Sequence, residues 1–131
     1  MMDILLKHQK SPLQISNFLA EVFECSTDKI KTCSLDEFNG LTEELDANAL
    51  NCICVFSPVQ GDASQLLQLY RYKMSDPSVT QRIVGVAMKN KIHIYIPGEP
   101  SNDWVYIGDA GSEHVRQIES DADDVFYFKT P

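Results

Sequence analysis

The sequence predicts an α+β fold: a single domain in which N-terminal helices pack on one face of a mainly antiparallel sheet. Helical patterns come early in the chain and strand patterns come late, an order that favours this class. The chain has 131 residues, of which 44% are apolar and 23% are charged, and this composition suits one globular domain over residues 1–131. No repeat, linker or low-complexity tract divides the sequence.

The first predicted element is a helix that begins at Ser11. A serine at the N-cap followed by Pro12 is a strong helix start. The apolar residues that follow have the i, i+3, i+4, i+7, i+8 spacing of a one-sided helix, and they are Ile15, Phe18, Leu19, Val22 and Phe23. We expect this stripe to pack against the core, and a groove for a partner is the alternative.

Shorter elements are predicted in the middle of the chain. Residues 28–35 contain a short strand, 36–40 a turn or helical turn, and 41–50 a short acidic helix. Residues 51–58 form a continuous apolar run bounded by turn signals, which is typical of a strand buried on both faces. We place this strand at the centre of the sheet.

Residues 63–74 are compatible with either a helix or a strand. After a helix-like start at 62–65, four apolar residues share one helical face, and they are Leu66, Leu67, Tyr70 and Met74. This pattern favours a helix. The loose alternation over 69–72 would instead suit a strand.

The clearest strand signals lie in the second half of the chain. Two β-rich runs, 83–88 and 92–96, flank a tight connection and predict a hairpin, in which Ile94 should be buried. A further strand is predicted over 103–108, followed by a loop. Segments 115–119 and 125–129 predict a second hairpin, although 112–119 could instead form one short helix.

The net charge excludes several functions. It is −8, from 11 basic and 19 acidic residues, which argues against nucleic acid or an anionic membrane as a partner. The chain start lacks the basic region and the roughly 7–15-residue apolar run of a signal peptide. No stretch approaches the ~20 apolar residues of a membrane span. We therefore predict a cytoplasmic protein.

The cysteines predict no metal site. Cys52 and Cys54 would share one face of a strand, as metal ligands can. Zinc sites usually use C-x₂₋₄-C pairs, however, and no second close pair occurs. We expect reduced, small buried thiols, with no metal ion and no cofactor, at the four cysteines Cys25, Cys33, Cys52 and Cys54.

Two acidic blocks dominate the charge distribution. Residues 36–65 carry six acids and no base, and residues 101–131 carry seven acids and two bases. Complementary charge speeds the encounter of two proteins, so these blocks predict a docking surface for a basic protein. A solvated face that keeps the chain soluble is the alternative. The candidate partner-binding residues are Glu43, Glu44, Asp46, Glu119, Asp121, Asp123 and Asp124.

Neither a calcium loop nor an active site is predicted. The 121–124 run lacks the glycine and the distant glutamate of an EF-hand loop, and strands rather than helices are predicted beside it. No G-x-S-x-G, H-E-x-x-H or glycine-rich phosphate loop occurs. The nearest catalytic combination consists of Asp109, Glu113 and His114, with His93 or Cys54 as a further member.

A small, acidic, one-domain chain with this α+β order and no catalytic motif resembles the immunity proteins with which bacteria neutralise toxins. Those of contact-dependent growth inhibition are the nearest type. The resemblance implies a monomeric cytoplasmic protein that binds a cognate toxin domain, often a basic nuclease, and blocks its active site. The seven candidate acids are the residues whose chemistry matches that role.

Two other classes remain open. Type III secretion chaperones are also small, acidic α+β proteins that open with a helix, and they dimerise to bind an extended effector segment. The chain departs from them because 125–128 predicts a strand where a chaperone ends in a helix. A small hydrolase is the third hypothesis, and it would need a pocket that unites His93 or His114 with acids.

Overall fold

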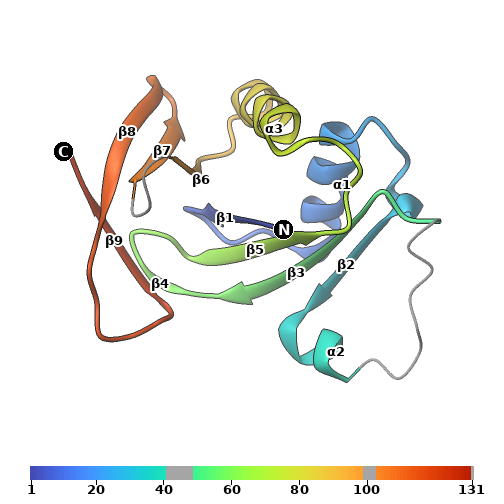
Figure 1. Cartoon of the computed structure of the whole chain (residues 1–131), viewed down its shortest axis with the longest axis horizontal. Coiled ribbons are helices and arrows are strands. Elements are labelled where there is room, and N and C mark those ends of the chain that lie inside the picture. Colours follow the sequence, from blue (N-terminus) through green and yellow to red (C-terminus); the bar gives the residue numbers. More distant parts are fainter. Residues whose placement is uncertain (41–48, 99–102, 131) are drawn as a thin grey trace.

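The computed structural model describes residues 1–40, 49–98 and 103–130 (Figure 1). Its helices are α1 (Pro12–Val22), α2 (Leu35–Asn39) and α3 (Asp76–Asn90), with a 3₁₀ turn at Thr27–Lys29. Its strands are β1 (Met2–Leu6), β2 (Ile30–Ser34), β3 (Cys52–Pro58), β4 (Gln60–Gly61), β5 (Gln65–Tyr70), β6 (Ile94–Pro97), β7 (Asp103–Gly108), β8 (Gly111–Ile118) and β9 (Val125–Lys129).

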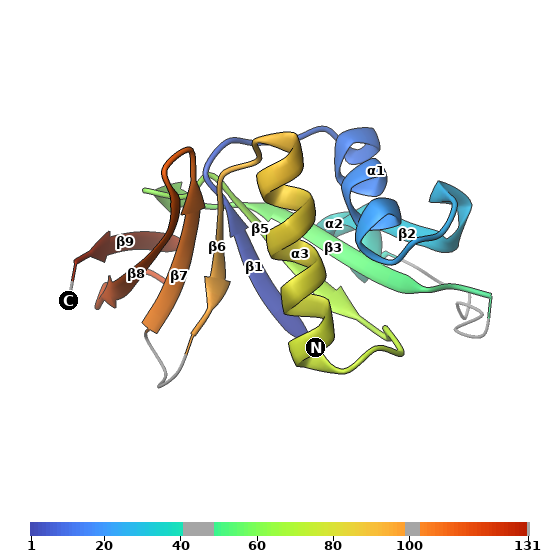
Figure 2. The same ribbon diagram turned by 90° about the horizontal axis from the view of Figure 1, so that it is seen from above.

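These strands form one sheet in the order β2-β3-β5-β1-β6-β7-β8-β9-β4. β2 pairs with β3 and β4 with β9 in parallel, and the other described pairings are antiparallel. α1 and α3 lie on the same face of the sheet, as Figure 1 and Figure 2 show. The predicted α+β class with a mainly antiparallel sheet is confirmed, and the two long helices α1 and α3 lie on one face as expected. The short α2 lies against the other face, where Phe38 stacks on Tyr70 of β5.

α1 begins at the predicted residue. The Ser11 hydroxyl accepts a hydrogen bond from the Gln14 backbone N–H (3.2 Å), and the Gln14 side chain accepts one from the Ser11 N–H (2.9 Å), which together make a capping box. At the other end, Arg82 of α3 donates to the carbonyl oxygens of Glu21 and Val22 at 2.9 and 3.0 Å. These bonds satisfy acceptors that a helix C-terminus leaves free. The predicted apolar stripe is buried.

β1, which the sequence analysis did not predict, lies near the centre of the sheet. β1 pairs with β5 on one side and with β6 on the other, and its residues Ile4, Leu5 and Leu6 are buried. The 51–58 run forms β3, which is buried on both faces as predicted, but β3 lies next to the edge strand β2. Its predicted central position is wrong, because strands from the chain start and from the second half occupy the middle of the sheet.

The first half of the hairpin predicted over 83–96 is wrong. Residues 83–88 belong to α3, and the strand β6 begins only after it. Ser75 caps this helix by accepting a hydrogen bond from the Ser78 N–H (3.3 Å), and Pro77 fits the first turn. The β-branched residues at 83–86 suggested a strand, but they belong to a helical apolar face that begins upstream at Val79. The buried residues of this face are Val79, Ile83, Val86 and Ala87.

Residues 63–74 contain the strand β5 rather than the favoured helix. Leu67 and Leu69 face α1 and α3 together with Gln65, which is also buried. The Gln65 amide is satisfied because its side chain bonds the backbone N–H and carbonyl of Lys10 at 3.0 and 3.2 Å. Residues 112–119 lie almost entirely in β8, and the predicted hairpin of β8 with β9 is confirmed.

The parallel pairing of β4 with β9 curls one end of the sheet. Gln60 and Gly61 pair with Val125 and Phe126, so the face opposite the helices encloses a second core. Within it the rings of Tyr95 and Phe128 stack with their centroids 4.1 Å apart. This second core fixes the β8–β9 hairpin to the rest of the domain, and its buried members are Leu5, Val59, Ala63, Tyr95 and Val115.

Candidate functional site

The structure places four of the seven predicted acids in one connection. They lie between β8 and β9, where every residue from 119 to 124 is exposed, and we call them the acidic turn: Glu119, Asp121, Asp123 and Asp124. The other three, Glu43, Glu44 and Asp46, lie outside the described residues. The structure therefore brings together the second predicted acidic group and leaves the first as a prediction.

The acidic turn is anchored at both of its ends. On one side β8 and β9 pair up to Ile118 and Tyr127. On the other side the Asp124 carbonyl accepts a hydrogen bond of 2.8 Å from the Gln60 N–H of β4. Beside the turn is a polar hollow of about 480 Å³, lined by Gln117, Glu119, Ser120 and Asp121. The turn is thus a held segment, and two of its four acids, Glu119 and Asp121, line a recess.

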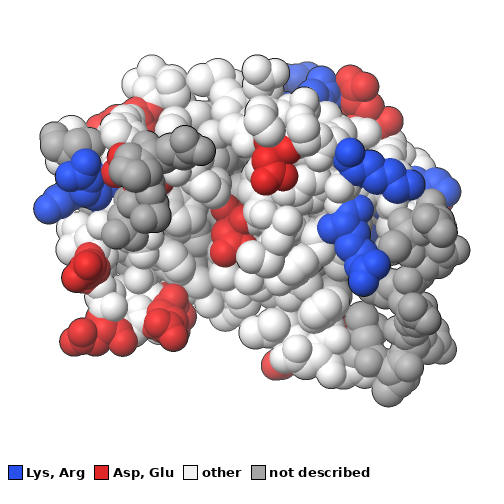
Figure 3. All heavy atoms as spheres, in the orientation of Figure 1, with Lys and Arg blue, Asp and Glu red and all other residues white. Residues whose placement is uncertain are grey.

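Within the described part of the chain, no lysine, arginine or histidine lies within ion-pair distance of the acidic turn. Arg116, which precedes the turn on β8, is paired with Asp103 of β7 instead (3.1 Å). Figure 3 shows acidic side chains gathered at the lower left, over the β8–β9 connection, whereas most basic side chains on this face lie at the opposite side. The carboxylates of the acidic turn therefore have no ion-pair partner among the described residues.

Sequence reasoning missed two exposed apolar residues beside the acidic turn. Ile118 and Tyr127 are 40% and 48% exposed, and they face each other as the last described pair of the β8–β9 ladder. The signal was present in the alternation of β8. Ile118 shares its face with the exposed His114 and Arg116 and not with the buried Val115.

The catalytic combination considered from sequence is only partly assembled. His93 Nε2 lies 2.8 Å from Asp109 Oδ1, and this hydrogen bond, together with the His93 charge, lowers the pKa of the Asp109 carboxyl. His114 pairs with Asp103 instead (3.2 Å). Cys54 lies in the core under the helices, and Glu113 lies on β8 opposite Tyr106.

The ring nitrogen of His93 that does not bond Asp109 is enclosed, which disfavours general base catalysis by this pair. A catalytic histidine uses one ring nitrogen to meet its orienting carboxylate and the other to meet the substrate. Here His93 Nδ1 is buried and has no hydrogen-bond partner among the described residues, so a substrate does not reach it in this conformation. The pair links the β7–β8 turn to the segment before β6, beside an open hollow of about 540 Å³.

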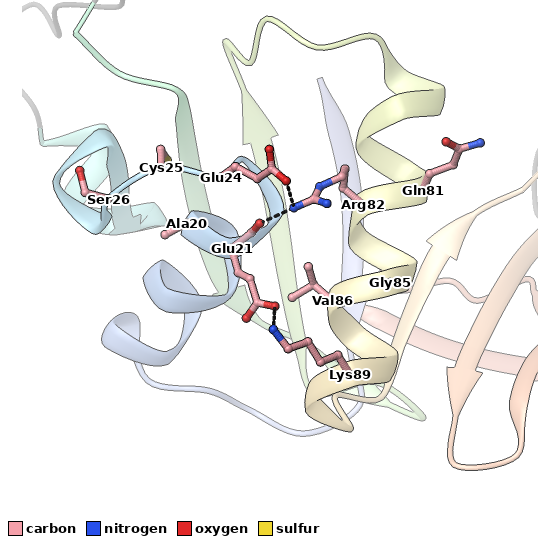
Figure 4. A pocket seen from close by; sticks show the side chains of 10 residues that line it. All are labelled: Ala20, Glu21, Glu24, Cys25, Ser26, Gln81, Arg82, Gly85, Val86 and Lys89. Carbon is pink, nitrogen blue, oxygen red and sulfur yellow. Dashed lines mark hydrogen bonds and ion pairs between the residues drawn. The ribbon is translucent and has the colours of Figure 1, made fainter.

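A groove of about 800 Å³ runs between the C-terminal end of α1 and α3 (Figure 4). Arg82 lies 3.1 Å from Glu24, and Lys89 lies 3.0 Å from Glu21. The four charged side chains that line the groove therefore neutralise one another across it. Gly85 of α3 also lines this groove and is exposed.

Gly85→Ala should raise the free energy of unfolding by roughly 0.5–1 kcal/mol. Glycine inside a helix costs conformational entropy, and an added Cβ at this position meets no atom within 4 Å. Urea unfolding followed by circular dichroism measures the change. If Gly85→Ala instead destabilises the protein, the space around Gly85 is not open as the structure shows it.

The cysteines are packed rather than poised for chemistry. Cys33, Cys52 and Cys54 are buried and Cys25 is half-buried, and all are free thiols. Burial raises the pKa of the Cys52 thiol to about 12 and that of Cys54 well above its ordinary value. Because the thiolate is the form that binds metals and attacks electrophiles, these two groups are weak in both roles.

Comparisons with known proteins find nothing similar: no family model, no curated protein and no solved structure matches this chain. In the described ranges, no three His, Cys, Asp or Glu side chains converge as metal ligands would. No helix of those ranges is long and apolar enough to cross a membrane.

Proposed function

We propose that the protein is a cytoplasmic immunity protein, which binds a basic toxin domain through the acidic turn and blocks its active site. The observation that carries this proposal is the group of exposed carboxylates with no cation in reach among the described residues. Like charges held close together repel one another. A basic partner would relieve that repulsion on binding.

The anchoring of the turn supports inhibition rather than loose attraction. A toxin domain that acts on nucleic acid needs a basic active site, because phosphate contacts supply much of the binding energy. Carboxylates on a held turn compete for the same basic groups. Because both ends of the turn are fixed by hydrogen bonds of β8, β9 and β4, binding loses less conformational entropy than it would with a flexible loop.

The proposal is tested with one defined partner: the toxin-like domain encoded by the reading frame next to this gene. The triple variant Asp121→Asn, Asp123→Asn, Asp124→Asn should slow association with that domain by about tenfold at low ionic strength and flatten its salt dependence. The reason is that complementary charge acts mainly on encounter. Stopped-flow mixing at several salt concentrations measures both quantities. The same variant should protect cells that express the toxin less well.

The matched control changes the same number of acids outside both acidic blocks. Glu24→Gln, Asp28→Asn, Asp76→Asn alters the net charge equally at three exposed positions in or beside helical turns, where the amides keep the hydrogen-bonding capacity. At about 0.15 M ionic strength it should leave the association rate within about twofold of wild type, because charges more than about 8 Å from the contact are then largely screened. Equal slowing by both variants would mean that net charge, not the acidic turn, governs the encounter. No binding by the wild-type protein would contradict the proposed function itself.

The first predicted acidic group is tested in the same experiment. Glu43→Gln, Glu44→Gln, Asp46→Asn removes its three charges. If this variant alone slows association, docking occurs at that group and the assignment to the acidic turn is wrong.

A further inference from the structure

We propose that Ile118 and Tyr127 form the apolar centre of the docking surface, with the acidic turn as its rim. This inference rests on the proposed function and names the chemistry of its partner. The two side chains lie directly opposite each other in the ladder, immediately before the turn, and are 40% and 48% exposed. Protein interfaces typically combine an apolar centre with a polar rim, and tyrosine is enriched among the residues that carry most of the binding energy.

The position of the pair in the fold explains why it is uncovered. Alternation along β8 and β9 places Ile118 and Tyr127 on the face of the sheet that carries the helices, because Val115, Phe126 and Phe128 belong to the second core on the other face. In Figure 2 α3 lies over β1, and the outer strands β8 and β9 lie farther to the left, beyond β6 and β7. The pair thus belongs to a part of the sheet face that no helix of the described ranges covers.

The edge of β9 is closed, so a partner has to approach this face. β4 pairs with the first two residues of β9. Farther along, the Phe128 N–H donates a hydrogen bond of 2.9 Å to the Asp62 carboxylate, which occupies a donor that an added strand would use. Side-chain contacts at Ile118 and Tyr127 therefore fit this hairpin better than strand addition.

Charge along the hairpin defines the partner's surface. The acidic turn lies on one side of the apolar pair, and Arg116 and Lys129, which are paired across β8 and β9, lie on the other. Arg116 is already bonded to Asp103, so Lys129 carries the charge on that side. The complementary surface is an apolar depression with lysines or arginines on one side and a carboxylate on the other. Burying Ile118 and Tyr127 would also exclude water from the rim pairs and strengthen them.

The test uses the adjacent-gene domain as the probe. The double variant Ile118→Thr, Tyr127→Thr keeps strand propensity and removes the apolar surface. It should speed dissociation so that Kd rises at least about 100-fold, while the salt dependence of association stays that of wild type. Tyr127→Phe keeps the ring and should bind within about threefold of wild type.

The control is Leu13→Gln, Met88→Gln, which removes two apolar side chains on the helices that are at least as exposed as Ile118, 68% and 45%. It should bind as wild type does. If the threonine variant dissociates at the wild-type rate while the Asn variant of the acidic turn associates slowly, this inference is overturned and the proposed function stands. If wild type does not bind the domain at all, both are overturned. Unfolding curves are measured for every variant. If the threonine variant does not fold, Tyr127→Phe still tests the inference, because a tenfold rise in Kd for Tyr127→Phe would contradict an apolar role of Tyr127.

Discussion

Ile94→Ala should lower the free energy of unfolding by about 2–5 kcal/mol. The Ile94 side chain has no exposed surface, and its partners across the ladder, Leu6 of β1 and Ile107 of β7, are buried as well. The substitution loses the transfer free energy of three carbon atoms. It also leaves a cavity that neighbours held by strand pairing on both sides fill only in part. Urea unfolding followed by circular dichroism and by Trp104 fluorescence measures the loss.

Ile118→Ala is the matched control, because the same atoms are removed from a residue that is 40% exposed. It should lower the free energy of unfolding by only about 1 kcal/mol, mainly because alanine has a lower strand propensity than isoleucine. Equal losses at the two positions would contradict the burial of Ile94, and with it the register that places β6 between β1 and β7.

Gly61→Ala should lower the free energy of unfolding by about 2–4 kcal/mol. Gly61 has φ of +100°, a conformation that alanine rarely adopts. An added Cβ would lie 2.2 Å from the Phe126 carbonyl oxygen, so β4 and β9 would have to separate. Hydrogen exchange should show this separation as lost protection of the Gln60 and Asp62 amides, which donate to the carbonyls of Asp124 and Phe126 at 2.8 and 2.7 Å.

Gly111→Ala separates the two causes. Gly111 has a similar φ of +107°, but its added Cβ would meet no atom within 4 Å. Gly111→Ala should therefore lower the free energy of unfolding only by the conformational cost of the positive φ, about 1 kcal/mol. If Gly61→Ala costs no more than Gly111→Ala, the close approach of β4 to β9 is not as the structure has it.

Signals that act over a few residues predicted their elements well. The pair Ser11 and Pro12 marked the start of α1 because a cap bonds the helix's own first turn. The apolar run at 51–58 marked β3, and the run at 125–129 after an acidic turn marked β9. The error at 83–88 had the opposite origin: the decisive residues, Ser75 and Val79, lay upstream of a run whose composition favours strands.

The candidate site divides in the same way. The acidic turn was predictable because charged residues between two strands have to remain in water. The contact between His93 and Asp109 was considered among several combinations, but which nitrogen meets the carboxylate, and that the other is enclosed, are facts of packing. Ile118 and Tyr127 escaped notice because an apolar residue in a strand is expected to be covered.

Composition and short-range pattern were sufficient for the α+β class, the first helix, the last hairpin and the location of four acids, since each depends on residues close together in the chain. The packed structure alone decided that β1 lies in the interior of the sheet between β5 and β6, that β4 pairs with β9, and that Ile118 and Tyr127 are exposed to water. Those features depend on segments far apart in sequence. Whether a strand is central or a side chain is exposed depends on which segment packs beside it. A local sequence pattern carries no information about a neighbouring segment that is distant in the chain.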